Sequence, residues 1–280
     1  MHVVKQIAAG GGVSVEQVLI RAQTPKWSEP EAPPGYRLVF VRQGTFRARV
    51  GGHVLLADPA LAYVGGPGVE QSIAHRVGAP DVCTSVRLCA ELLAGLVETD
   101  RPLSASMPVS GSVAVAERLL VARARQRADG FELAERATRL AGSLLGSASH
   151  TAAGTRRPAT VRGTRRPATV AAQRRLADAA RQALAAEPAQ PSLPGLARSV
   201  GCSPHHLSRV FHRATGLTLT QYRRRILVLA ALDAIEAGER DLAGLAARLG
   251  FADHAHLTRT VRQECGRTPR DLRLLLAQPN

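Results

Sequence analysis

The 280-residue chain is long enough for about two domains of ~100–200 residues, and its 45% hydrophobic content excludes a largely disordered protein. Its formal net charge of +15 indicates an anionic partner, either nucleic acid or a membrane surface. Three glycines, Glu16 and Gln17 interrupt the apolar stretch 7–20, so we expect neither a membrane span nor a cleaved leader. The four cysteines lack zinc-site spacing. We expect a soluble cytoplasmic protein with reduced thiols, no metal and no other cofactor.

The first predicted domain covers residues 1–95 and is rich in short strands. Residues 38–41 form an apolar run, residues 45–50 alternate with a period of two, and Gly51-Gly52 predicts a hairpin turn. Further glycines and prolines divide the stretch up to residue 90 into two or three more strands. Short strands at this regular spacing indicate a small β-barrel or sandwich.

Two amphipathic helices are predicted within a helical segment, residues 96–149. Residues 113–120 place apolar side chains on one helical face, and residues 131–145 do so on a second. An apolar face with little to cover it favours a dimer interface with a second copy of the chain. Packing of the same face against the β domain within one chain explains the pattern equally well.

Residues 150–170 are predicted to be a linker that carries a direct repeat. The sequence Thr-Arg-Arg-Pro-Ala-Thr-Val occurs at 155–161 and again at 164–170. Its prolines, paired arginines and few apolar residues predict an extended and mobile stretch. The plain interpretation is a duplicated solvated spacer, and the alternative is an arginine arm that enters a DNA minor groove.

The C-terminal domain, residues 171–280, contains one helical pattern twice. Residues 196–201 align with residues 245–250, and after the turn the alignment pairs Ser203 with Asp253 and Arg209 with Arg259. Each copy has a short helix, a glycine at the turn and an amphipathic second helix. We therefore predict helix-turn-helix units at 192–215 and 241–265.

Further helices and most of the positive charge surround these two units. A helix from about 171 to 186 is predicted to precede them, one from about 218 to 237 to join them, and a short one to follow Pro269. Residues 155–280 hold 21 arginines against 9 acidic residues. This distribution places the positive field over the duplicated module, as DNA binding requires.

The second helix of each unit is predicted to begin at an N-cap, Ser203 or Asp253, whose side-chain oxygen accepts a free helix N–H. An apolar face follows at helical spacing, formed by Leu207, Val210 and Phe211 in the first copy and by Leu257 and Val261 in the second. The opposite faces supply the candidate DNA-contacting residues: His205, His206, Ser208, Arg209, His212, His254, Ala255, His256, Thr258, Arg259 and Arg262. Arg209 and Arg259 are the strongest, because a guanidinium can bond guanine O6 and N7 together. Each is otherwise a solvated or phosphate-bound arginine.

At these residues the chain resembles the AraC/XylS family of bacterial transcription regulators. The resemblance covers residues 171–276, with one match at Ser203-Pro204-His205-His206-Leu207-Ser208-Arg209-Val210-Phe211 and a second that runs from Gly250-Phe251 to Gly266-Arg267-Thr268-Pro269. The family usually has aromatic residues at positions 257 and 261 and often tyrosine at position 272, where this chain has Leu257, Val261 and Leu272. These changes keep the apolar character of the core.

The resemblance implies a sequence-specific regulator of transcription that is not an enzyme and that binds double-stranded promoter DNA. Its long linking helix is expected to hold the two recognition helices about 34 Å apart, in successive segments of the major groove. RNA polymerase, a small-molecule effector and a second copy of the chain are further candidate partners, and no membrane partner is expected.

The β-rich part resembles, over residues 10–95, the cupin-like effector domain common in this family, so the expected fold class is α+β, with a cupin-like β-barrel, trailing helices and an all-α C-terminal domain. A barrel of this size can hold one small molecule. Its candidate polar groups are Arg37, Arg42, His53, Tyr63 and His75, each of which is otherwise an ordinary surface or core residue. The competing hypotheses are a cupin-type metal-dependent enzyme fused to a DNA-binding domain and a ligand-independent regulator controlled by a protein partner.

Overall fold

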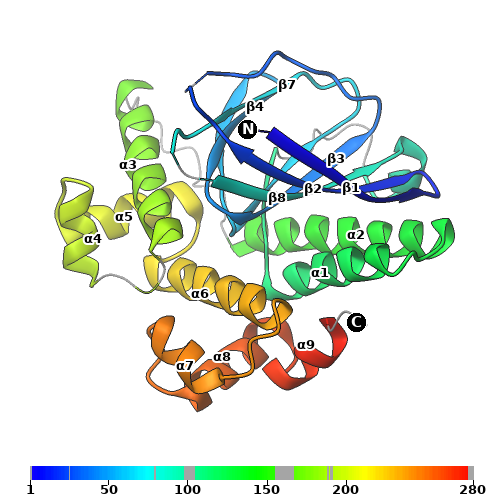
Figure 1. Cartoon of the computed structure of the whole chain (residues 1–280). Coiled ribbons are helices and arrows are strands. Elements are labelled where there is room, and N and C mark those ends of the chain that lie inside the picture. The colour runs from blue at the N-terminus through cyan, green and yellow to red at the C-terminus, as the bar shows by residue number, and fades with distance from the viewer. Residues whose placement is uncertain are drawn as a thin grey trace.

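A computed structural model describes residues 2–24, 26–78, 80–97, 105–154, 167–187, 189 and 192–276, and side chains within these ranges except at 147–154 and 167–168. The chain forms two β-sheets and then a series of helices (Figure 1). This arrangement confirms the predicted α+β class, with strands in the N-terminal part and helices after it.

The larger sheet has six antiparallel strands. In spatial order they are β1 (His2–Gly10), β2 (Val13–Arg21), β8 (Pro80–Leu88), β3 (Tyr36–Gln43), β6 (Leu61–Gly65) and β9 (Ser106–Pro108). β1 and β2 include the apolar stretch 7–20, whose glycines argue against a membrane span. Gly11 and Gly12 have φ of +59° and +77°, which favours glycine, and they form the turn between these two strands.

The smaller sheet has three strands, in the order β5 (His53–Ala57), β4 (Phe46–Val50) and β7 (Gln71–His75). The predicted hairpin is confirmed: β4 and β5 pair with Val50 opposite His53, and Gly51 and Gly52 both have positive φ. Buried side chains from both sheets, among them Val41, Phe46 and Tyr63, pack together between them. The described strands thus form a sandwich of two sheets and do not close into the expected barrel.

Two helices cover the other face of the larger sheet (Figure 1). α1 (Gly111–Arg125) and α2 (Gly130–Gly154) pack on each other, and α2 contacts β1, β2 and β9, while the short helix η1 (Ala90–Leu93) lies against α2. The predicted helix pair is confirmed, and most of its apolar side chains are buried within one chain. Phe131 at the start of α2 is 83% exposed, so a dimer interface through these helices stays a prediction.

The C-terminal helices begin with α3 (Pro167–Ala186). The first unit is α4 (Leu193–Ser199) and α5 (Pro204–Thr215), α6 (Leu219–Glu236) joins it to the second, and the second unit is α7 (Leu242–Arg248) and α8 (His254–Cys265), followed by α9 (Pro269–Leu276). Both predicted helix-turn-helix units are confirmed. α3 starts inside the predicted linker, whereas the first repeat, at 155–161, lies outside the described residues.

The two units belong to different hydrophobic cores. Leu257 and Val261 of the second unit share one continuous core with α1, α2 and the larger sheet, whereas Leu207 and Phe211 of the first unit pack in a separate cluster with α3, α4 and α6. The second unit is therefore packed directly on the N-terminal part of the chain. No helix in the described ranges is long and apolar enough to cross a membrane.

Candidate nucleic-acid interface

Each recognition helix, α5 and α8, starts at the predicted N-cap. Ser203 Oγ accepts the backbone N–H of His206 at 3.3 Å, and Asp253 Oδ1 accepts that of His256 at 2.6 Å. The hydrogen bond from the His256 backbone holds the pKa of Asp253 below its usual range, with a smaller contribution from the nearby Arg259 guanidinium. Both predicted caps are confirmed.

The turns of the two units also match. Gly201 and Gly250 have φ of +74° and +73°, a left-handed conformation in which a side chain would be strained. This shared turn gives the two recognition helices the same entry from the preceding helix.

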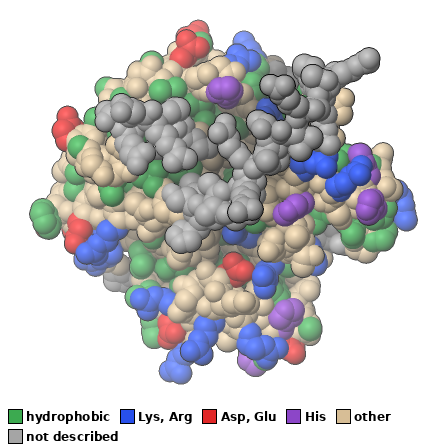
Figure 2. All heavy atoms as spheres, turned by 180° about the vertical axis from the view of Figure 1, so that it is seen from behind, with side chains coloured by type: hydrophobic (Ala, Val, Ile, Leu, Met, Phe, Trp, Pro, Cys, Tyr) green, Lys and Arg blue, Asp and Glu red, His purple; other side chains and the backbone are tan. Residues whose placement is uncertain are grey.

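The faces of both recognition helices are divided as the apolar spacing predicts. Leu207, Phe211, Leu257 and Val261 are fully buried. On the opposite sides, the exposed candidates are His205, Arg209, His212, His254, His256, Arg259 and Arg262, and the half-buried ones are His206, Ser208, Ala255 and Thr258. Figure 2 shows basic and histidine side chains gathered over the lobe of α3–α5 and over α7–α9.

Arg209 and Arg259 occupy the same position on the two helices, six residues after the respective caps, and both are exposed. Neither lies within 4.0 Å of a carboxylate oxygen of the described residues. A guanidinium in this position is free to bind a phosphate or a base edge without first breaking an ion pair.

Two candidates on α8 are turned partly into the protein. The ring of His256 packs edge-on against Phe251 with 5.3 Å between centroids, and its Nδ1 accepts the Ala252 N–H at 3.4 Å. The hydroxyl of Thr258 is buried. These two side chains are less available for DNA than Arg259 or His254.

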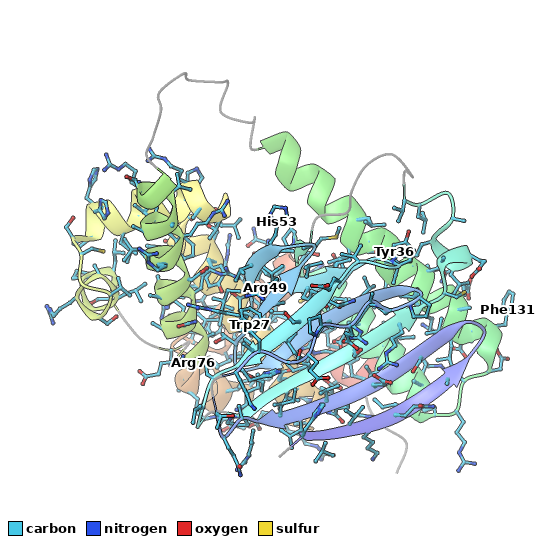
Figure 3. All side chains as sticks on the ribbon, turned by 90° about the horizontal axis from the view of Figure 1, so that it is seen from above. Trp27, Tyr36, Arg49, His53, Arg76 and Phe131 are labelled. Atoms are coloured by element: carbon cyan, nitrogen blue, oxygen red, sulfur yellow. The ribbon has the colours of Figure 1, made fainter. Side chains whose placement is uncertain are left out.

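Within the described part of the chain, the five residues expected to surround an effector have different neighbours. Arg37 pairs with Glu31 and lies near the buried Tyr63, whose pKa is raised by burial. His75 Nδ1 is 2.6 Å from Asp81 Oδ2, inside the β domain. His53 is exposed, and Figure 3 shows it on the same side of the β domain as Arg49 and Trp27, whose guanidinium and ring are 4.3 Å apart.

The expected place of Arg42 needs correction, because its guanidinium faces the helices and not the space between the sheets. It lies 3.0 Å from Glu117 on α1 and 2.8 Å from Asp233 on α6, and it also pairs with Glu236. Arg118 of α1 reaches the same Asp233 at 2.5 Å. We call these five residues the α6 network, and it joins β3 and α1 to the end of the helix that links the two reading units.

A second polar contact joins the β domain to α3 and α6, the helices that pack against the first unit. Asp58, after β5, is fully buried and accepts hydrogen bonds from Arg181 Nε of α3 at 2.7 Å and from the Tyr222 hydroxyl of α6 at 2.6 Å. Burial, reinforced by Asp58, raises the pKa of Tyr222. Sequence reasoning missed both contacts, and no local signal in the sequence indicates either of them.

The C-terminal helices match known proteins in sequence. Residues 196–274 match a family of helix-turn-helix domains. The regulatory protein SoxS of Salmonella typhimurium is 37% identical over 79 residues, which are 28% of this chain and 73% of that protein. This chain belongs to the AraC/XylS family of regulators. The transcriptional activator RhaR of Yersinia pseudotuberculosis is 33% identical over 67 residues, and the chain spans only 23% of its length.

Solved structures give weaker matches. A transcriptional regulator from Chromobacterium violaceum with an AraC-type DNA-binding domain is 24% identical, and the match covers 39% of this chain and 99% of that one with a TM-score of 0.36. ToxT from Vibrio cholerae is 7% identical over 96% of this chain and 99% of its own, also with a TM-score of 0.36. The family assignment of this chain rests on its sequence relatives.

Proposed function

We propose that this AraC/XylS family member is a cytoplasmic, sequence-specific transcription regulator that binds double-stranded promoter DNA through α5 and α8. The observation that carries the proposal is the matched geometry of these helices, in which each begins at a side-chain cap and presents an exposed, unpaired arginine at the same position. The named relatives SoxS and RhaR are a regulatory protein and a transcriptional activator.

The proposed division of the chain assigns the signal to its N-terminal part. Residues 1–95 would sense an effector, the helical segment 96–149 would serve in dimerisation, 150–170 would link and 171–280 would bind DNA. The α6 network and the Asp58 contact support this division, because they are the polar connections through which a change in the β sandwich reaches α3 and α6. RNA polymerase and a second copy of the chain are proposed as further partners on DNA.

We propose no enzymatic activity. In the described ranges no group of three or more His, Cys, Asp or Glu side chains is placed to hold a metal ion, and the relatives are regulators. Metal analysis of the purified protein tests this directly, since stoichiometric bound metal would favour the cupin-type enzyme. A rise in melting temperature or operator affinity with an effector would exclude the ligand-independent alternative.

The test of DNA binding is selection of bound sequences from a random pool, followed by gel-shift titration of the selected site. Replacing Arg209 and Arg259 by alanine together should weaken binding strongly, since each bidentate base contact discriminates by ~1–3 kcal/mol, or about 5- to 150-fold. The control is Arg240→Ala, which removes an exposed arginine beyond the end of α6. Unchanged affinity and sequence preference in the double variant would show that the assigned helices do not read DNA.

A further inference from the structure

A cavity of about 290 Å³ lies between the two helix-turn-helix units, away from the β sandwich. Its walls come from α3 and α4 on one side, from the α7–α8 turn and α8 on the other, and from α6, which crosses between them. Apolar side chains form most of the lining: Leu184, Leu193, Leu196, Leu219, Leu227 and Phe251. The volume is at the lower end of the range of ~300–1,000 Å³ that small-molecule sites occupy.

The polar side chains of this lining are basic or carry a hydroxyl, and none is acidic. It contains Arg223, Arg224, His256 and two threonines but no aspartate or glutamate. Arg224 Nε lies 3.3 Å from Glu264 Oε1, so its charge is balanced inside the protein. Because His256 Nδ1 accepts the Ala252 N–H, the proton of the neutral ring is on Nε2, and the ring can donate a hydrogen bond.

Arg223 differs from Arg224 in having no carboxylate oxygen of the described residues within 4.0 Å. Its Nη2 donates to the Ala189 carbonyl at 3.0 Å, while its Nε is buried and makes no hydrogen bond within the described part of the chain. A half-buried guanidinium with one unused donor and no counter-charge, beside a leucine-rich wall, is a site for an anion that carries an apolar body.

We propose that this cavity binds a small amphipathic carboxylate, with its apolar body against Leu196, Leu227 and Phe251 and its carboxylate on Arg223. A rigid aromatic acid of one or two rings fits best, because the six apolar side chains come from elements of both units and would enclose a flat body. Such a ligand touches both units and so fixes their relative orientation. Binding of this ligand does not depend on the proposed function. Only an effect of the ligand on the affinity for operator DNA would rest on that function.

The experiment measures thermal unfolding and isothermal titration of the full chain without DNA, using 2-naphthoate as the anionic probe and 2-naphthamide as its uncharged match. We expect 2-naphthoate to raise Tm by at least about 2 °C at saturation and to bind with a stoichiometry of one, and 2-naphthamide to bind at least tenfold more weakly. Arg223→Gln should reduce 2-naphthoate binding at least tenfold, whereas Arg240→Gln, an exposed arginine outside the lining, should leave it unchanged.

A second variant keeps the test decisive if Arg223→Gln is poorly folded. Thr220 is exposed and lines the cavity, and Thr220→Trp should fill part of the cavity while Arg223 itself is kept. The proposal is overturned if 2-naphthoate does not bind, if the amide binds equally well, or if neither variant weakens binding. A separate gel-shift titration at several salt concentrations tests the remaining alternative: the proposal is also overturned if Arg223→Gln changes the salt dependence of DNA affinity but not 2-naphthoate binding, because Arg223 is then a phosphate contact.

Discussion

Replacement of Asp58 by asparagine tests whether the first reading unit is held on the β sandwich by a buried charge. Arg181 and Tyr222 both donate to Asp58 Oδ2, and the Ala60 N–H donates to Oδ1 at 2.8 Å. Asparagine offers one oxygen and one NH₂ group. In either orientation its NH₂ meets a donor, and Arg181, whose side chain is 7% exposed, loses this buried counter-charge.

The expected cost follows from this geometry. Breaking a buried ion pair by removing one partner costs about 3–5 kcal/mol, and a chain of this size loses about 2–4 °C in Tm per kcal/mol, so Asp58→Asn should lower Tm by roughly 6–20 °C. Asp178→Asn is the matched control, because Asp178 also pairs with Arg181, at 3.0 Å, but is one-third exposed and lies on the same helix. Burial raises the pKa of Asp178, so its ionised form is already disfavoured and its neutralisation should cost less than about 1 kcal/mol.

The assay is thermal unfolding for Tm and urea unfolding for the free energy of unfolding, both followed by circular dichroism, with both single variants and the wild type at pH 7. The double variant Asp58→Leu with Arg181→Met, which removes both charges, should recover most of the stability that Asp58→Asn loses. If Asp58→Asn and Asp178→Asn are equally mild, the buried contact does not hold the two parts together and our account of it is refuted.

Three further predictions concern other parts of the fold. Because the pKa of Asp253 is lowered in the folded protein, its ionised cap stabilises α8 fully above the unfolded pKa of ~3.9 and loses this effect as pH falls through the folded value. The Tm advantage of wild type over Asp253→Asn should therefore shrink below about pH 4. A constant difference in Tm from pH 7 to about 2.5 would contradict this. Gly111→Ala should destabilise the protein, because a Cβ there would lie 2.4 Å from the Glu264 carbonyl oxygen on α8. Gly142→Ala, inside α2 with open space around it, should instead add about 0.5–1 kcal/mol to the free energy of unfolding in urea. Equal changes in this free energy for the two variants would refute the packing of α1 on α8. Burial raises the pKa of Cys265 to about 12, so its thiol should not react with iodoacetamide at pH 8 in the native protein, whereas the half-buried Cys89 should be labelled. Mass spectrometry measures the labelling. Rapid labelling of Cys265 would show that its site opens.

The C-terminal helices could be predicted because their determinants are local. A cap, a turn glycine and the apolar spacing of a recognition helix all lie within about fifteen residues, and the second copy tests the interpretation of the first. Ser203 and Asp253 therefore stand where the alignment of the two copies places them. Exposure of Arg209 and Arg259 follows from the same helical period.

The β domain could be predicted only as a set of strands. Whether two sheets close into a barrel depends on pairing between strands far apart in the chain, and β3 pairs with β8 and β6, not with its neighbour β4. The β1–β2 hairpin was missed even though its signal was present, since Gly11 and Gly12 stand between two alternating runs. The α6 network was beyond local reasoning because Arg42 and Asp233 are 191 residues apart.

The two helix-turn-helix units are similar in sequence but pack against different parts of the protein. Leu257 of the second unit lies in the core that also contains the larger sheet, and the start of α1 abuts the end of α8 at Glu264. Leu207 of the first unit lies in a small cluster, to which the sandwich contributes Ala60 beside the buried Asp58. The alignment of the two copies therefore matches the surfaces proposed to contact DNA, whereas tertiary packing makes the units unequal. A disturbance of α1 should reach α8 directly, and the first unit through α6 and through the contacts of Asp58 and Ala60.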